Sequence, residues 1–347
     1  MEVIELLRKL IATPSFSREE RAAADIVWQF MQAQGLAPRR LGNNVWCIAP
    51  HYREDRPTVL LNAHLDTVRP ATGWQHDPFQ PTLEGDSLYG LGANDCGGGL
   101  VSLLEAFRRL APRPRPYNLV YAATAEEEVS GPGGIESLLP HLPPVSVAIV
   151  GEPTGLQPAI AERGLMVLDC TATGRSGHAA RDEGDNAIYR ALPVIDWFRT
   201  FRFPKVSPLL GPVKMSVTVI QAGTTHNQVP DRCTFTVDVR VNELYTNEEV
   251  LDIIKTHVTG DVKARSTRLR SSRIDPGHPL VRRLLAMGKQ PYGSPTLSDQ
   301  ALMPFPSLKL GPGDSARSHA ADEYIRLSEI SEAVNLYVKL LDTDLSL

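Results

Sequence analysis

Two histidines and three carboxylates stand where apolar runs of this sequence give way to loops. Imidazole nitrogen and carboxylate oxygen, without thiolate, are ligands that suit zinc, or less selectively cobalt or manganese. Two metal ions about 3.5–4 Å apart need one bridging carboxylate, plus one histidine and one carboxylate for each ion. The set supplies these ligands with none left over, and therefore predicts a dinuclear metal site. The five residues are His64, Asp95, Glu128, Glu152 and His319.

Each of these residues taken alone also has an ordinary structural explanation. His64 could be a hydrogen-bonded core histidine, and Asp95 could serve the turn that the following glycines predict. Glu152 could begin a loop, and His319 could cap a helix. A single short motif of this kind is only a hypothesis, so the prediction depends on the whole set.

Three adjacent carboxylates, Glu126, Glu127 and Glu128, directly follow the apolar run 119–123. The run predicts a buried strand, and burying three like charges at its end is unfavourable because desolvation and mutual repulsion both oppose it. We therefore expect a cation at the end of this strand. Asp66, two residues beyond His64, is expected to accept the second ring N–H of that histidine and so fix its tautomer.

The elements that must position these residues alternate between short apolar runs and helical patterns. This alternation predicts an α/β sheet that is buried on both faces and binds ligands at the carboxyl ends of its strands. A capping box at Ser17–Glu20 is expected to open the second helix, and Gly35 to close it. We expect strands at 44–50, 57–62, 119–123 and 145–150, and helices at 3–11, 17–35 and 100–110.

The pattern changes after residue 164, where strands and helices follow in the order β-α-β-β-α-β. This order predicts a ferredoxin-like unit inserted into the α/β domain. After it, a helix at 280–287, a loop with Ser318-His319 and a C-terminal helix resume the first domain. We therefore predict a catalytic metal-binding domain of residues 1–163 and 277–347, with an inserted domain of residues 164–276.

Composition excludes several classes of function. The chain has 347 residues, 42% hydrophobic and 22% charged, which is typical of a globular protein with more than one domain. Its net charge of −4 leaves no basic excess for nucleic acid, and no apolar run reaches the roughly 20 residues of a membrane helix. The four cysteines lie far apart, which argues against a disulfide framework and favours a reducing cytoplasmic location.

Eight segments, in order along nearly the whole chain, resemble the motifs of the M20 metallopeptidases. This family includes acetylornithine deacetylases, succinyl-diaminopimelate desuccinylases, aminoacylases and carboxypeptidases. The resemblance implies a zinc-peptidase-like α/β catalytic domain with an inserted ferredoxin-like dimerisation or lid domain. The segments are HLDTV (64–68), GWQHDPF (73–79), YGLGANDCGGG (89–99), TAEEE (124–128), GEPT (151–154), GRSGHAA (174–180), AGTTHNQVP (222–230) and SHAADEY (318–324).

The resemblance assigns a role to each residue of the predicted metal site. It implies that His64, Asp95 and Glu152 bind one zinc ion, and that Asp95, Glu128 and His319 bind the other, with Asp95 bridging. Glu127 matches the general base of the family, and Asp66 the carboxylate that orients a histidine ligand. One departure is that Cys96 and Gly97 follow Asp95 in place of the usual motif, which contains a lysine.

The resemblance also implies residues that contact the substrate. His178 falls where the family places a lid histidine that steadies the oxyanion, often from the partner subunit. Asn227 and Arg240 match lid positions that help to hold substrate. Three polar residues in the loops before His319 could read the rest of the substrate: Thr296, Ser298 and Arg317.

We therefore expect a metal-dependent enzyme that hydrolyses the amide bond of an N-acyl amino acid. The first expectation is an acetylornithine deacetylase-like enzyme of arginine biosynthesis, with two zinc ions (cobalt or manganese as alternatives), forming a homodimer. The alternatives are a succinyl-diaminopimelate desuccinylase, a dipeptidase or carboxypeptidase of the same family, and a non-catalytic ligand-binding relative. A complete ligand set together with Glu127 argues against the last.

Overall fold

The computed structural model describes residues 2–181 and 183–343, which form two compact units. Unit one comprises Met1–Ile160, Arg273–Tyr292 and Ser298–Leu347, and unit two comprises Ala161–Ser272 and Gly293–Leu297. The domain ranges expected from the sequence, 1–163 with 277–347 and 164–276, stay a prediction, and residues 1 and 344–347 lie outside the described residues.

Unit one is built on a sheet with the strand order β1-β2-β6-β3-β7-β17-β8. Strands β6, β3, β7 and β17 run parallel, so their carboxyl ends share one edge, while β2 and β8 pair antiparallel at the flanks. The strands are β1 (Arg39–Leu41), β2 (Asn44–Ile48), β3 (Thr58–His64), β6 (Asn118–Thr124), β7 (Val147–Val150), β8 (Ala159–Glu162) and β17 (Ser307–Lys309).

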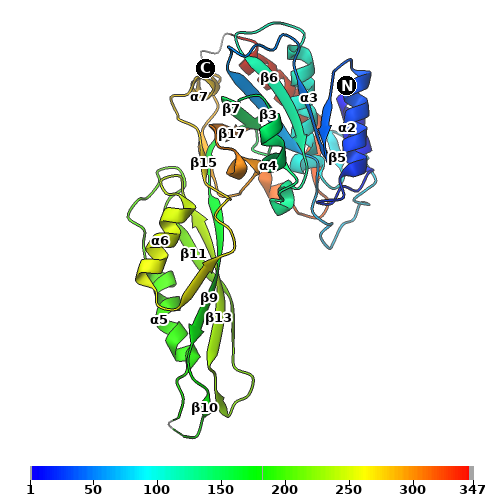
Figure 1. The fold of residues 1–347 in the computed structure, drawn as a ribbon. Helices are drawn as coiled ribbons and strands as arrows, with labels where there is room; N and C mark the ends of the chain where they lie inside the picture. Colours follow the sequence, from blue (N-terminus) through cyan, green and yellow to red (C-terminus); the bar gives the residue numbers. More distant parts are fainter. Residues whose placement is uncertain (1, 182, 344–347) are drawn as a thin grey trace. The chain divides into compact units, whose positions relative to one another are not determined.

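Both faces of the central strands are buried, because side chains of alternate residues pack against helices on opposite sides. On one face, Tyr121 contacts Phe107 of α3 (Gly98–Leu110). Helix α3, labelled in Figure 1, packs in turn against α1 (Glu2–Ile11) and α8 (Leu327–Leu341). On the other face, Leu60, Val120 and Ala148 pack with Ile135 and Leu138 of α4 (Ile135–Leu138). The remaining elements are α2 (Arg21–Ala33), α7 (Pro279–Ala286) and the short helices η1 (Ala93–Gly97), η2 (Glu127–Val129), η3 (Leu139–His141), η4 (Asp299–Leu302) and η5 (Ser315–Arg317).

Unit one also contains a small antiparallel sheet in the order β18-β5-β4. Its strands are β4 (Thr82–Glu84), β5 (Ser87–Tyr89) and β18 (Tyr324–Arg326). This sheet places the segment after residue 319 beside the segment that leads into Asp95, because Tyr324 pairs with Tyr89. Two further strands, β15 (Ser272–Arg273) and β16 (Tyr292–Ser294), occur where the chain passes between units.

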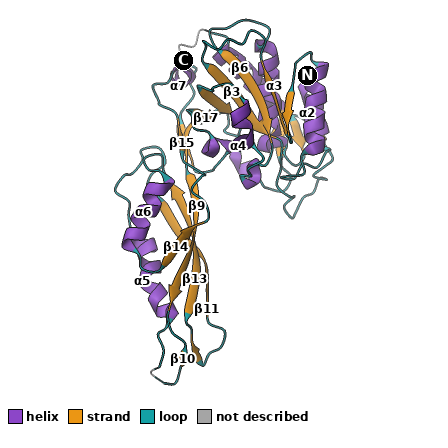
Figure 2. Ribbon diagram, in the orientation of Figure 1, coloured by secondary structure: helices purple, strands orange, loops and turns teal. Residues whose placement is uncertain are grey.

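Unit two has the predicted order of elements. A four-stranded antiparallel sheet, β11-β13-β9-β14, is covered on one face by both helices (Figure 2). Alternate residues of β9, such as Leu168 and Cys170, face the helices, while the intervening residues are more exposed. The elements are β9 (Gly164–Thr173), β10 (Gly177–His178), α5 (Ala187–Thr200), β11 (Lys214–Ala222), β12 (Gln228–Val229), β13 (Arg232–Val241), α6 (Asn247–His257) and β14 (Asp261–Ala264).

The predicted α/β class and the inserted β-α-β-β-α-β unit are confirmed. One local prediction is wrong: Ser17 and Glu20 form no capping box, and α2 begins only at Arg21. The Ser17 hydroxyl instead donates to Asp66, and the Glu20 carboxylate accepts the main-chain N–H of Arg18. The short strands β8 and β17 were not predicted, because runs of three or four residues give too little periodicity. No helix among the described residues is long and apolar enough to cross a membrane.

Candidate metal centre

The shared carboxyl edge of the parallel strands brings together residues that are far apart in the sequence. His64 is the last residue of β3, Glu127 and Glu128 follow β6 in the turn η2, and Glu152 follows β7. Because β3 lies between β6 and β7, the imidazole of His64 stands between the two groups of carboxylates.

Asp95 and His319 reach the same place from loops. Asp95 lies in the turn before α3, and a Cβ at Gly99 of that helix would collide with the carbonyl of Gly151. Glycine is therefore required for α3 to begin so close to the end of β7. His319 lies between η5 and β18, in a loop where it adopts the left-handed conformation at φ +59°.

Asp95 stands between the two imidazoles. Its Oδ1 lies 3.1 Å from Nε2 of His64, and its Oδ2 lies 3.6 Å from Nε2 of His319. On the His64 side, Nε2 is also 3.7 Å from Oε1 of Glu152 and 4.0 Å from Oε2 of Glu127. On the His319 side, Nε2 is 3.0 Å from Oε2 of Glu128. The structure thus brings all five predicted ligands together.

Three groups of side chains have ligand atoms within 4.8 Å of one another: Asp95, Glu128 and His319; His64, Cys96 and Glu152; and His64, Glu127 and Glu128. Cys96 was not expected in such a group. Its Sγ accepts the main-chain N–H of His64 at 3.2 Å, and burial raises the pKa of its thiol. The thiol is therefore neutral here, and its hydrogen bond holds the end of β3.

The residues fit a pair of cations. Oε1 of Glu152 is buried and accepts no hydrogen bond from any residue that the structure describes. Burial, together with the charge of Asp95, raises the pKa of Glu152 to about 8 even though His64 and Lys309 oppose the shift. Burial and the nearby Glu152 likewise raise the pKa of Glu127 well above its ordinary value. Positive charge placed between buried carboxylates with raised pKa values stabilises their ionised forms.

Asp66 contacts both His64 and the turn after β6, and its role in orienting the His64 ring stays a prediction. The ring Nδ1 of His64 lies 2.8 Å from the main-chain oxygen of Asp66, and 3.6 Å from its Oδ1. The two carboxylate oxygens also accept the main-chain N–H groups of Glu127 and Glu128, at 3.0 and 3.1 Å, and the hydroxyl of Ser17 donates to the carboxylate at 2.7 Å. The side chain of Asp66 therefore fixes the turn that carries Glu127 and Glu128.

Glu323 is a residue of the site that sequence reasoning missed. It is 2% exposed, and its carboxylate accepts the main-chain N–H groups of Gly92, Asn94 and Asp95 at 2.8–3.1 Å. Burial raises its pKa to about 7, against the effect of these hydrogen bonds. Its position four residues after His319, inside a recognised motif, was the available signal.

Glu126, which had no predicted role, has a structural one. It adopts φ +57°, and its carboxylate accepts the N–H of Gly133 at 3.3 Å. A Cβ at Gly131 would collide with this carboxylate, so the glycine allows the side chain to fold back over the turn. Glu126 therefore points away from the predicted ligands.

The predicted lid residues belong to unit two. His178 is exposed in β10, where its Nδ1 accepts the N–H of Ala180 at 3.1 Å. Asn227 is exposed, and its carbonyl accepts the N–H of Ala179. Arg240 of β13 is paired with Asp238 at 2.8 Å. Their roles toward substrate stay predictions.

The three loop residues expected to read substrate have partners within the protein. Both terminal nitrogens of Arg317 donate to Glu329, at 2.8 and 3.0 Å, and its guanidinium lies over the ring of Tyr324. Ser298 caps η4 by accepting the N–H of Gln300, and Thr296 bonds to Ser294. Thr296 lies in unit two.

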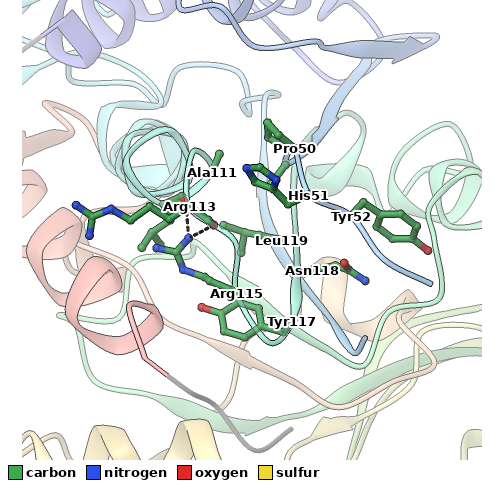
Figure 3. Close-up of a pocket in the computed structure, with 11 residues that line it drawn as sticks. Pro50, His51, Tyr52, Ala111, Arg113, Arg115, Tyr117, Asn118 and Leu119 are labelled. Carbon is green, nitrogen blue, oxygen red and sulfur yellow. Dashed lines mark hydrogen bonds between the residues drawn. The ribbon is translucent and has the colours of Figure 1, made fainter. Parts of the chain in front are cut away.

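A separate hollow lies at the opposite end of β6, beside Tyr117, Asn118 and Leu119 (Figure 3). Its most prominent charged group, Arg115, donates to the carbonyls of Leu110 and Arg113 and pairs with Asp342 at 2.9 Å. This arginine closes the end of α3. Among the residues that the structure describes, none that lines the hollow belongs to a group of possible metal ligands.

The sequence of the chain matches the model of peptidase family M20/M25/M40 over residues 60–343. It is also 31% identical, over 352 residues, to a Mycobacterium tuberculosis protein provisionally assigned as the succinyl-diaminopimelate desuccinylase DapE, covering 97% of each chain. The chain therefore belongs to peptidase family M20/M25/M40. The predicted family is confirmed.

Solved structures show the same fold. Aminopeptidase PepT of Bacillus cereus superposes with a TM-score of 0.79 at 17% identity, covering 98% of this chain and 97% of that one. YxeP of Bacillus subtilis, described as a dinuclear metal-binding peptidase of the M20 family, superposes with a TM-score of 0.75 at 17% identity, covering 98% and 96%. The prediction of an enzyme that hydrolyses amide bonds is confirmed by the family.

We expect Asp66→Asn to lower kcat/KM by about 10–100-fold, the usual cost of losing a residue that holds metal ligands in place. Asparagine keeps one acceptor oxygen, but its NH2 group would face the N–H of Glu127 or Glu128. Steady-state kinetics measure the effect. Asp86→Asn is the matched control, because Asp86 also accepts a main-chain N–H and a serine hydroxyl, both from Ser328, away from the site. Equal losses in the two variants would refute the role of Asp66.

Proposed function

We propose that this chain hydrolyses the amide bond of an N-acyl amino acid at a pair of zinc ions. His64, Asp95 and Glu152 would hold one ion, and Asp95, Glu128 and His319 the other. The observation that carries the proposal is the position of Asp95, which presents one carboxylate oxygen to each imidazole, at 3.1 and 3.6 Å. When bound, the ions supply Lewis-acid polarisation of the carbonyl and make water more acidic.

Glu127 is the proposed proton carrier. Its side chain is 10% exposed and lies 4.0 Å from Nε2 of His64, at the edge of the ligand cluster. A carboxylate whose pKa is raised by burial is a stronger base than a free one, so it can accept the proton of the attacking water near neutral pH. The same group would then return the proton to the nitrogen of the leaving amine. Without that proton the nitrogen would have to leave as a strongly basic anion, which is a very poor leaving group.

Residues of unit two complete the proposal. His178 would donate to the developing oxyanion, which its exposed ring leaves it free to do. Arg240 would hold the substrate carboxylate in a bidentate pair, and Asn227 would add a hydrogen bond. Arg240 pairs with Asp238 in the structure, so binding substrate requires that its guanidinium exchange one carboxylate for another.

For the substrate, we propose N-acetyl- or N-succinyl-ornithine or -citrulline, which would place the enzyme in arginine biosynthesis in the cytoplasm. The 31% identity to the provisionally assigned DapE favours N-succinyl-diaminopimelate as the second candidate. Both carry an acylated amino acid with a free carboxylate, so the same metal centre would serve either.

Glu127→Gln should lower kcat by at least about 10²-fold, since general acid–base catalysis contributes about 10²–10⁴-fold. The amide is close in shape to the carboxylate but cannot accept the proton, so metal content measured by plasma emission should stay at two ions per chain. Glu126→Gln is the control, because the neighbouring carboxylate points away from the site. Near-wild-type turnover by metal-loaded Glu127→Gln would show that another group carries the proton.

A substrate panel separates the candidates. The purified enzyme is assayed with N-acetyl- and N-succinyl-ornithine, -citrulline and -diaminopimelate, and with dipeptides. We expect kcat/KM to be highest for an acylated ornithine or citrulline. A higher kcat/KM for N-succinyl-diaminopimelate would instead identify the chain as a desuccinylase of that compound. A preference for dipeptides would identify it as a peptidase. Absence of turnover on the whole panel by metal-loaded enzyme would favour a non-catalytic relative.

We also propose a homodimer formed through unit two. Strand β11 is an edge strand, and exposed apolar residues lie on it and on the adjoining α5: Val219 is 48% exposed, Ile220 53%, Leu192 53% and Tyr189 71%.

The substitution Ile220→Lys should convert the dimer to monomers, as measured by light scattering. Leu285→Lys, at an exposed apolar position of unit one (44% exposed), should leave the dimer intact. A monomeric wild-type protein at micromolar concentration would exclude the dimer and any action of His178 across subunits.

A further inference from the structure

Glu323 joins the two loops that deliver Asp95 and His319. It lies between His319 and β18, and it is almost completely buried. Its Oε1 accepts the N–H groups of Asn94 and Asp95 at 2.8 and 2.9 Å, and its Oε2 accepts that of Gly92 at 3.1 Å. Its own carbonyl accepts the N–H of Gly90 at 3.0 Å. One residue thus hydrogen-bonds four main-chain amides of the loop that ends in Asp95.

The loop of His319 needs such an attachment. Both His319 and Asp322 adopt left-handed backbone conformations, at φ +59° and +54°, which are uncommon for residues other than glycine and are stabilised here by tertiary contacts. Asp322 accepts the N–H groups of Gln75 and His76 at 3.0 and 2.9 Å, which fixes the far side of the loop. Glu323 fixes the side that faces Asp95.

Asn94 adds a second connection between the same loops. Its Oδ1 accepts the N–H of Asp314, and its Nδ2 donates to the carbonyl of Asp314 and to the hydroxyl of Ser318, at 3.0–3.3 Å. Because the N–H of Asn94 is held by Glu323, the side-chain and main-chain contacts reinforce each other. This network links the segment of Asp95 to the loop of His319, and Oδ2 of Asp95 lies 3.6 Å from Nε2 of His319.

We propose that Glu323 is a positioning residue for the metal pair, acting mainly on the half formed by Asp95, Glu128 and His319. Two of the three ligands of that half, Asp95 and His319, lie on loops that Glu323 joins. In the other half, formed by His64, Asp95 and Glu152, only Asp95 lies on such a loop. Asp66 has the corresponding role on the other side, where it joins the end of β3 to the turn of Glu127 and Glu128. This inference rests on the proposed metal centre.

The test is the affinity for Zn²⁺ measured by chelator competition on metal-free full-length protein. Wild type should bind two ions, and His319→Ala identifies the binding step that belongs to the His319 half. Glu323→Gln should weaken that step by about 10–100-fold and leave the other step within about threefold, because the amide keeps the shape but turns N–H groups toward Gly92. If Glu323→Gln does not fold, Glu323→Asp, which keeps the charge with a shorter reach, should weaken the same step.

Glu105→Gln is the matched control for losing a buried carboxylate. Glu105 is 4% exposed on α3 and bonds Arg108 and Arg109. It should lower the thermal unfolding temperature without changing either binding step. Equal affinities in wild type and Glu323→Gln, or equal weakening of both steps, would overturn the role of Glu323. Failure of wild type to bind two ions would instead overturn the proposed metal centre.

Discussion

The constraint on which this site depends is the burial of several carboxylates side by side at one sheet edge. Such groups need positive charge or hydrogen-bond donors, since desolvation otherwise forces them to stay protonated. The protein answers the problem in two ways. Around the site, the buried carboxylates of Glu20, Asp66 and Glu323 accept main-chain N–H groups of neighbouring loops. In the centre, Oε1 of Glu152 accepts no hydrogen bond from the described residues, and burial raises the pKa values of both Glu152 and Glu127.

This division explains the architecture of the loops. A carboxylate that accepts two or three main-chain N–H groups fixes the conformation of the segment that donates them, so the surrounding residues hold the central ones in place. Asp66 fixes the turn after β6, Glu20 accepts the N–H of Glu126 at its start, and Glu323 fixes the approach to Asp95. The folded scaffold therefore holds the central carboxylates close together.

The strand-end residues could be predicted from the sequence, because parallel strands place their carboxyl ends at one edge whatever the loops do. His64, Glu128 and Glu152 followed from that rule, and the inserted unit from its order of elements. The surrounding carboxylates could not, since Glu20 and Glu323 act through main-chain groups whose directions depend on loop conformation. Ser17 shows the difficulty. Its spacing from Glu20 fits a capping box, yet its hydroxyl donates a hydrogen bond to Asp66, 49 residues away in sequence. Arg317 likewise forms an ion pair with Glu329, which no local sequence pattern predicts.

The turn after β6 shows how one short segment gives three identical side chains different surroundings. Left-handed residues stand at both ends, Glu126 at φ +57° and Ser130 at φ +44°, so the chain reverses within five residues. The carboxylate of Asp66 accepts two of the three main-chain N–H groups between them, those of Glu127 and Glu128. Glu126 consequently folds back over the glycines, Glu127 faces His64 and Glu128 faces His319. A side chain one position along would meet a different partner, so the proposed roles of proton carrier and ligand follow from the turn geometry and not from the residue type.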